Sequence, residues 1–206
     1  MTDPDRSPAA ADLRLPDTSL IVCSRNRPVL LAETVDSILQ GEAVPTELII
    51  IDQSDVEHAT LPDLATDRPC EMRDMWKRTA GLSRANNQGI AAACHDLLVF
   101  THDDITVPAD WFAAIVAAAV QAGPRAVVTG QVRAGAAPTA GGFAPATKVD
   151  EAPAVNAGRL IQDVVYPLNM ALYRSAVDEV GGFDERLGPC TPFPGFGGRR
   201  PGLPLA

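Results

Sequence analysis

The sequence predicts an α/β protein with a Rossmann-like, mostly parallel sheet flanked by helices. Short apolar runs of strand length alternate with segments of helical periodicity, and this alternation is typical of βαβ units. Three of the apolar runs, at 19–23, 47–51 and 97–100, lead directly into Ser, Asp or His side chains. The carboxyl ends of parallel strands share one edge of a sheet, where ligands bind, so these polar side chains mark a candidate site.

The first strand–loop–helix unit lies between residues 19 and 45. Residues 19–23 form a continuous apolar strand, and the polar loop after it leads into a helix that runs through Leu39. Gly41 and Pro45 end this helix, because glycine favours a helix terminus and proline cannot continue the hydrogen-bond pattern. A second buried strand at 47–51 completes a βαβ unit.

The middle of the chain is less regular. Residues 56–78 show no clean periodicity, and they predict a loop with a short strand near 70–72. Residues 81–93 predict a loop that leads into a helix of small side chains. The apolar strand at 97–100 follows, and it continues directly into a cluster that contains His102, Asp103 and Asp104.

Two carboxylates beside an imidazole at the end of a buried strand suit a divalent cation that carries a phosphorylated ligand. The alternative for Asp103 and Asp104 is a solvated turn with an Asp cap on the next helix, since Asp favours both positions. Asp52, which follows the second strand, also has two interpretations. It is either a hydrogen-bond acceptor for a ribose or a base, or a turn residue.

Beyond the acidic cluster the sequence predicts an amphipathic helix that begins near Asp110, followed by a strand at 126–132. Residues 135–158 are rich in Ala, Gly and Pro, and they predict a mobile loop over or beside the site. Apolar order returns at 164–173, and residues 174–180 predict a short helix.

A chain of 206 residues can bury one substantial core, so we expect a single domain at 18–190. Residues 1–17 have no apolar period and predict a flexible tail, because they bury too little surface to offset their ordering entropy. Residues 191–206 are dominated by Gly, Pro and Arg, and they predict a second, irregular tail.

The net charge of −9 argues against a nucleic-acid-binding protein, because neutralising phosphates takes clustered Lys and Arg. A phosphate group must therefore be met by a few local side chains or by a metal. The four cysteines show neither metal-site spacing nor a disulfide framework. No apolar run predicts a transmembrane segment, and the start lacks the features of a signal peptide. We expect a cytoplasmic protein, with peripheral attachment to a membrane left open.

Five stretches carry a resemblance to a known family. They are Leu20-Ile21-Val22-Cys23-Ser24-Arg25-Asn26-Arg27-Pro28, Ile49-Ile50-Ile51-Asp52-Gln53-Ser54, residues 81–89, residues 100–104 and residues 181–186. In this order the sequence resembles glycosyltransferase family 2, which has the GT-A nucleotide-sugar-binding fold, over about residues 19–194. The resemblance implies an inverting, metal-dependent transfer of a sugar from a nucleotide-diphosphate donor to a hydroxyl of a glycan, lipid or small-molecule acceptor.

The resemblance also implies a role for each matching position. Ser24 and Arg27 lie where the first loop of the family meets the nucleotide. Asp52 matches the acid that recognises the base, and Arg84 lies in the loop over the donor. Asn86 departs from the pattern, because it stands where many members of the family have Arg.

Asp104 matches the last acid of the family's Asp-X-Asp motif, so it is the expected ligand of the Mg²⁺ or Mn²⁺ that holds the diphosphate. Asp103 is expected to support the nucleotide-sugar site. His102 stands where the first acid of the motif is usual. A neutral imidazole can contact a ribose, a water or a transition metal, so the metal preference stays open.

The resemblance does not identify the catalytic base. The family places a Glu-Asp pair shortly after its Gly-Gly-Phe-Asp-Glu segment, but residues 194–200 contain no acid. Asp184 and Glu185 are the nearby acids, and they fit a helix end or an acceptor loop better than a substitute base. We therefore expect a carboxyl end that is truncated or frame-shifted, with the carboxyl-terminal part of the fold incomplete.

Two functions remain for the structure to address. The first is a sugar-transferring enzyme, and the second is a non-catalytic nucleotide-sugar-binding remnant or an inactive fragment. A nucleotidyltransferase that uses the same metal chemistry ranks below both, because no Gly-rich, Lys-bearing triphosphate loop follows the first strand. The sequence leaves the donor sugar, the base, the acceptor, the linkage and the oligomeric state undetermined.

Overall fold

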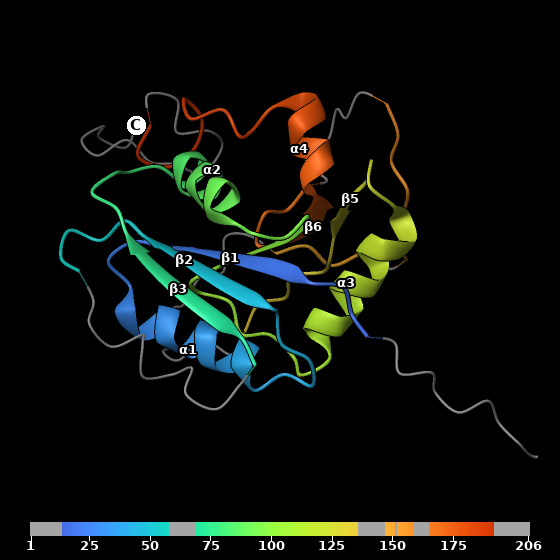
Figure 1. Ribbon diagram of the computed structural model, residues 1–206, viewed down its shortest axis with the longest axis horizontal. Helices are drawn as coiled ribbons and strands as arrows, with labels where there is room; N and C mark the ends of the chain where they lie inside the picture. Colours follow the sequence, from blue (N-terminus) through green and yellow to red (C-terminus); the bar gives the residue numbers. More distant parts are fainter. Residues whose placement is uncertain (1–13, 58–68, 136–146, 151, 159–164, 192–206) are drawn as a thin grey trace, which may run out of the picture.

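The computed structural model describes residues 14–57, 69–135, 147–150, 152–158 and 165–191. In this part of the chain, a six-stranded sheet lies between two layers of helices (Figure 1). The strands are β1 (Thr18–Ser24), β2 (Glu47–Asp52), β3 (Glu71–Trp76), β4 (Leu97–His102), β5 (Val127–Thr129) and β6 (Asn169–Tyr173). The helices are α1 (Pro28–Leu39), α2 (Leu82–Ala92), α3 (Trp111–Ala122) and α4 (Arg174–Val180).

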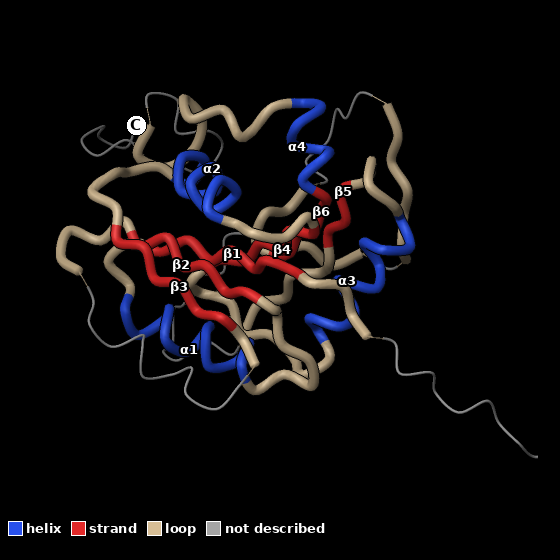
Figure 2. The backbone as a smooth tube through the Cα atoms, viewed as in Figure 1, coloured by secondary structure: helices blue, strands red, loops and turns tan. Residues whose placement is uncertain are grey.

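The sheet is mixed and has a parallel centre, which Figure 2 shows in red. The strand order is β3-β2-β1-β4-β6-β5, and β6 runs antiparallel to both β4 and β5. The chain moves outward from β1 to β2 and β3 on one side, and β4 lies on the other side. The strand order therefore reverses between β1 and β4, which is where open α/β sheets bind ligands. The predicted fold class is confirmed.

Helices bury both faces of the central strands. On one face, α1 and α3 cover a core that includes Leu20 and Val22 of β1. On the other face, α2 covers a second core that includes Ile21 and Cys23, and Val177 of α4 packs against it. Because successive residues of a strand face opposite sides, burial on both sides requires an uninterrupted apolar run. This explains why the central strands could be recognised from the sequence.

Helix α2 lies very close to β1. A Cβ atom at Gly89 would overlap the buried side chain of Ile21, so a larger residue would force Ile21 or the helix to shift. The close contact sets the helix on the central strand. It also brings Arg84, in the first turn of α2, to the edge of the sheet at which β1 and β2 end.

Strand β3 differs from the sequence-based expectation. It spans Glu71–Trp76, whereas the sequence predicted only a short strand near 70–72. All six residues are exposed or partly buried, because β3 forms an edge of the sheet. An edge strand need not carry an apolar run, and its polar residues concealed it from a search for apolar periodicity.

The predicted segments at the ends of the chain and in the long loop are described only in part. Leu15, which we expected in the amino-terminal tail, packs against the core beneath α1 and α3. Much of the predicted loop at 135–158 and nearly all of the predicted tail at 191–206 lie outside the described residues. Among the helices that the structure describes, none is long and apolar enough to span a bilayer.

An ion pair between the buried Glu47 and the partly exposed Arg73 joins β2 to β3. Glu47 is 1% exposed at the start of β2, and Arg73 of β3 donates to its Oε1 at 2.5 Å. The other carboxylate oxygen accepts hydrogen bonds from Ser19 Oγ at 2.6 Å and from the Cys94 amide at 3.0 Å. Burial raises the pKa of Glu47, but these donors outweigh it and hold the pKa below its usual value.

We predict that Glu47→Gln lowers the free energy of unfolding by about 2 kcal/mol at neutral pH, because Arg73 loses its buried anionic partner. The lowered pKa of Glu47 stabilises the fold above the usual glutamate pKa, and this contribution is lost as the pH falls through the folded-state pKa. The difference between the two proteins should therefore shrink in acid. Urea unfolding at pH 7 and at successively lower pH measures both effects.

Glu33→Gln is the matched control, because Glu33 is exposed on α1 and the same substitution should change the unfolding free energy little. An equal effect of the two substitutions would show that the buried pair contributes no special stability.

Candidate functional site

The parallel pairing of the strands brings three predicted site residues to one edge of the sheet. Ser24, Asp52 and His102 are the last residues of β1, β2 and β4. Ser24 lies opposite Asp52, and Cys23 lies opposite His102. The side chains that the sequence places at the ends of separate strands are therefore neighbours at the carboxyl edge, as the fold class requires.

Ser24, Arg27, Asp103 and Asp104 form an acid–arginine cluster at this edge. Ser24 Oγ donates to Asp103 Oδ2 at 2.8 Å. Arg27 Nη1 donates to Asp103 Oδ1 at 3.3 Å and to Asp104 Oδ2 at 2.9 Å. The guanidinium of Arg27 thus bridges the two adjacent carboxylates.

The two carboxylates of the cluster differ in their surroundings. Asp103 is buried, whereas the Asp104 side chain is 40% exposed. Burial raises the pKa of Asp103, the Ser24 hydrogen bond and Arg27 oppose this increase, and the net pKa lies above its usual value. Asp104 is therefore the carboxylate that a ligand from solution meets first.

His102 contributes a buried imidazole beside the cluster. Its Nε2 atom is buried and has no hydrogen-bond partner among the described residues. Burial lowers the pKa of His102, although Asp104 and Asp103 both act in the opposite direction. The ring is accordingly neutral at physiological pH, and its Nε2 is available to a ligand that reaches it.

A cleft of about 630 Å³ opens at the same edge of the sheet. Three arginines line it, whereas Asp55 is its one acidic lining residue. The lining residues are Arg25, Gln53, Ser54, Asp55, Arg78, Thr79, Ala80 and Arg84. A cleft with this excess of positive charge, in a chain whose net charge is −9, favours an anionic ligand.

The loop after β1 connects the cleft and the cluster. Asn26 adopts a left-handed backbone conformation with a φ of 57°, and its backbone N–H donates to Ser54 Oγ at 2.7 Å. Its side chain donates to Asp55 Oδ2 and accepts from the Asp55 amide, each at 3.0 Å. This fixed turn lets Arg25 line the cleft while Arg27 contacts the two carboxylates.

Asp52 stands behind the wall of the cleft. It is 1% exposed, and its Oδ1 accepts from the amide and the hydroxyl of Ser54 at 2.9 and 2.5 Å. These are the contacts of a turn residue. Its Oδ2 is buried without a partner among the described residues, so an acceptor remains for a donor on a ligand. A contact with the base stays a prediction.

Asn86 points into the protein rather than into the cleft. It is 3% exposed, and its side-chain oxygen accepts from the Cys23 thiol at a distance of 3.1 Å. An arginine at this position would need another orientation. The cationic lining of the cleft comes from Arg25, Arg78 and Arg84 instead.

Both acidic candidates for a base are paired with arginine. Asp184 accepts three hydrogen bonds from the Arg186 side chain and one from the Arg186 amide, and these bonds lower the pKa of Asp184 to about 2. Glu185 accepts from Arg84 Nε at 2.9 Å, and this bond, with one from Asn87, lowers the pKa of Glu185. Carboxylates held in this way are weak proton acceptors at neutral pH.

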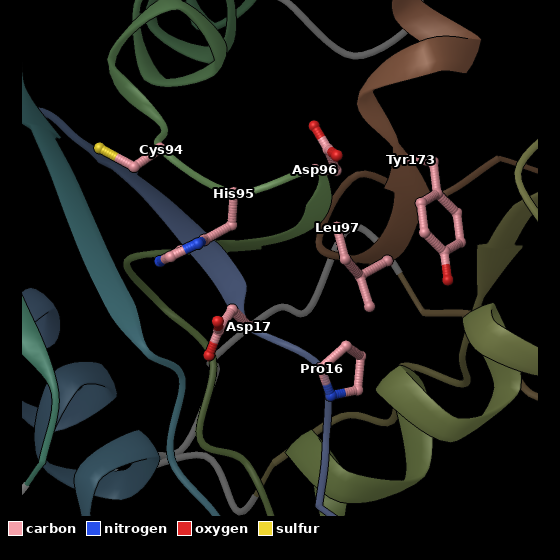
Figure 3. Close-up of a pocket in the computed structure, with 7 residues that line it drawn as sticks. All are labelled: Pro16, Asp17, Cys94, His95, Asp96, Leu97 and Tyr173. Carbon is pink, nitrogen blue, oxygen red and sulfur yellow. The ribbon is translucent and has the colours of Figure 1, made fainter.

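A second pocket, of about 320 Å³, lies at the opposite edge of the sheet. Figure 3 shows its lining residues, which are Pro16, Asp17, Cys94, His95, Asp96, Leu97 and Tyr173. None of the residues predicted to form the site is among them. The amino ends of β1 and β4 form this edge, whereas the acid–arginine cluster follows their carboxyl ends.

Comparison with models of protein families identifies the family of this chain. The model of the family described as "Glycosyl transferase family 2" matches residues 19–181, which is most of the chain. The chain belongs to this family. Its sheet and helices have the GT-A arrangement. A search of curated proteins finds no match.

Two solved structures are similar to this chain. A mannosyltransferase from Pyrobaculum calidifontis, PcManGT, in complex with GDP-Man and Mn²⁺, has 17% identity and a TM-score of 0.58. The match covers 85% of this chain and 50% of that one, so this chain spans about half the length of PcManGT. S. aureus TarS 1-349 in complex with UDP-GlcNAc has 16% identity and a TM-score of 0.47, over 60% of this chain and 37% of that one.

The carboxylates of the cluster fit a hard divalent cation that is shared with a phosphorylated ligand. Among the described residues, no group of three His, Cys, Asp or Glu side chains could hold a metal alone. Mg²⁺, however, commonly takes one or two protein carboxylates and completes its shell with waters and phosphate oxygens. Asp104, with Asp103 behind it, provides such a set.

Several residues of the cleft were not predicted from the sequence. Arg25 was quoted in the first motif without a role, and Arg78 lies in a stretch that showed no periodicity. Arg78 stacks on the ring of Trp76, with the guanidinium carbon 4.9 Å from the ring centroid. Gln53 donates to Thr79 Oγ1 at 3.0 Å and joins the loops after β2 and β3. In the sequence, only the position of Trp76 two residues before Arg78 could have indicated this stacked arginine.

Proposed function

We propose that this chain binds a nucleotide-diphosphate sugar at the carboxyl edge of its sheet and transfers the sugar, with inversion, to an acceptor hydroxyl. The observation that carries the proposal is the cleft lined by three arginines beside a carboxylate cluster, in a chain of glycosyltransferase family 2. The arginines suit the negative charge of a diphosphate, and the carboxylates suit the cation that accompanies it.

Two groups of described residues would contact the bound donor and its metal ion. Arg25, Arg78 and Arg84 offer guanidinium groups to the phosphates. Asp104 would hold Mg²⁺ or Mn²⁺, with Asp103 as the supporting carboxylate. Ser24 and Arg27 orient these carboxylates by donating hydrogen bonds to them. When bound, such an ion neutralises charge on the departing nucleoside diphosphate.

Inverting transfer places further demands on the acceptor side. The acceptor hydroxyl attacks the anomeric carbon from the face opposite the departing diphosphate, and its proton passes to a base. We assign no base, because Asp184 and Glu185 are both held by arginines. The acceptor is a glycan, a lipid or a small molecule with a free hydroxyl.

The second candidate function is nucleotide-sugar binding without transfer. The ion pairs of Asp184 and Glu185 favour it, since they leave both acids poor proton acceptors. An assay with a labelled nucleotide sugar and a mixture of acceptors separates the two functions. Both predict binding of the donor, but only the first predicts a labelled acceptor.

The proposed function predicts that GDP or UDP raises the unfolding temperature of the protein, and that Mn²⁺ or Mg²⁺ increases the effect. A ligand that binds only the folded state stabilises it by mass action, by about 2.7 kcal/mol at one hundred times its Kd. A thermal-shift series with GDP, UDP and TDP, each with either metal or with EDTA, measures this. The absence of any nucleotide effect would contradict the proposal.

We predict that Asp104→Asn removes the metal-dependent part of nucleotide binding, because an amide does not replace a carboxylate as a ligand for a hard cation. Calorimetry with GDP and UDP, in Mn²⁺ and in EDTA, measures the two parts separately. Asp110→Asn is the matched control, since Asp110 is also exposed and lies six residues along the chain. An undiminished Mn²⁺ effect in Asp104→Asn would exclude Asp104 as the ligand.

We predict that Asp52→Asn changes the discrimination among UDP, GDP and TDP. The amide can still accept from Ser54, but it places a donor where the unpartnered Oδ2 now offers an acceptor. A lost hydrogen bond to the base should weaken the preferred nucleotide roughly tenfold and the others less. Dissociation constants for the three nucleotides measure it, and equal weakening of all three would favour the turn role alone.

A further inference from the structure

The segment after α4 lies beside α2 (Figure 1), the helix whose Arg84 lines the cleft. Asn87 of α2 holds this segment by its backbone, because its side chain donates to the Phe183 carbonyl and accepts from the Phe183 amide, each at 2.9 Å. Ser83 Oγ donates to the Leu187 carbonyl, also at 2.9 Å. Two successive turns of α2 therefore fix the residues between Phe183 and Leu187.

Glu185 lies at the centre of this fixed stretch, and both of its carboxylate oxygens are engaged. Oε1 accepts from Asn87 Nδ2 at 3.2 Å, and Oε2 accepts from Arg84 Nε at 2.9 Å. These bonds, the one from Arg84 first, lower the pKa of Glu185 and keep it ionised. The carboxylate thus links a neutral anchor on α2 to a charged residue that lines the cleft.

The way in which Glu185 holds Arg84 leaves most of the guanidinium free. The contact uses Nε, and within the residues that the structure describes the two terminal nitrogens of Arg84 have no protein partner. Arg186 provides a contrast, because Asp184 occupies both its Nε and its Nη2, at 2.9 and 2.6 Å. Arg84 therefore keeps the two nitrogens that bind the oxygens of an anion in parallel.

We propose that Glu185 is a positioning residue: it fixes Arg84 through Nε so that the terminal nitrogens face an anionic group in the cleft, and Asn87 anchors Glu185. The identification of that anion as the diphosphate of the donor rests on the proposed function. A free arginine side chain must be ordered when it binds, and Glu185 removes part of this cost before the ligand arrives. The alternative is that Glu185 competes with the phosphates for Arg84.

The test measures the affinity of Glu185→Ala for GDP, UDP and inorganic pyrophosphate by calorimetry in Mn²⁺. If Glu185 orders Arg84, each ligand that binds the wild-type protein should bind the variant roughly threefold to tenfold more weakly. Glu185→Gln should recover most of the loss, because its amide oxygen can still accept from Arg84 Nε. In an Arg84→Ala background, Glu185→Ala should cause no further loss.

Glu179→Ala is the matched control, because Glu179 of α4 accepts from Arg125 at 2.6 Å in an exposed ion pair that does not line the cleft. It should leave the affinities unchanged. Unchanged or tighter binding by Glu185→Ala, or the same loss with Arg84 already removed, would overturn the positioning role. Tighter binding by Glu185→Ala would establish that Glu185 competes with the ligand for Arg84. The same loss in the Arg84→Ala background would show that Glu185 acts only by holding the segment on α2.

The same measurements separate this inference from the proposed function. Failure of GDP and UDP to bind the wild-type protein contradicts the proposed function, whereas weaker pyrophosphate binding by Glu185→Ala would still support the positioning role. Wild-type protein that binds none of the three ligands would overturn both. Wild-type binding of GDP or UDP that Glu185→Ala does not alter would overturn the positioning role alone.

Discussion

The parallel register of β1 with β2 and β4 is the constraint on which the site depends. Ser24 pairs with Asp52 and Cys23 with His102, so the loops after three strands begin at one level. Both faces of these strands are buried, and a slip of one residue would turn every side chain to the wrong face. The core therefore specifies the register strongly, and the positions of Ser24, Asp52 and Asp103 follow from it.

The site also depends on how its charges are paired. A buried carboxylate such as Asp103 is costly unless donors satisfy it, and Ser24 and Arg27 supply them. The turn at Asn26 separates Arg27 from Arg25, so one short loop serves the carboxylate cluster and the arginine cleft. This local arrangement explains how a chain of net charge −9 can present a cationic cleft to an anionic ligand.

The segment after α4 is physically part of this arrangement, although the family match ends at residue 181. Phe183 packs edge-on against Phe100 of β4, with the ring centroids 5.9 Å apart, and its backbone is held by Asn87. A Cβ atom at Gly182 would lie 2.7 Å from the Asn87 side-chain oxygen, so a larger residue would displace the amide that holds the Phe183 backbone. The Gly-Gly-Phe-Asp-Glu sequence thus has a structural reason that is separate from any role in catalysis.

The sequence by itself determined the fold class, the central strands and the short helix α4, because fully buried strands need apolar runs and helices need their own period. It also indicated that Ser24, Asp52 and the cluster at His102 share one edge. It indicated only a short strand near 70–72 and missed the full length of the edge strand β3, whose residues are all exposed or partly buried. Only the tertiary structure decided that Arg25 and Arg78 join Arg84 in a cleft, and that the exposed Glu185 accepts a hydrogen bond from Arg84. Such pairings join residues as many as 101 positions apart, and no local pattern encodes them.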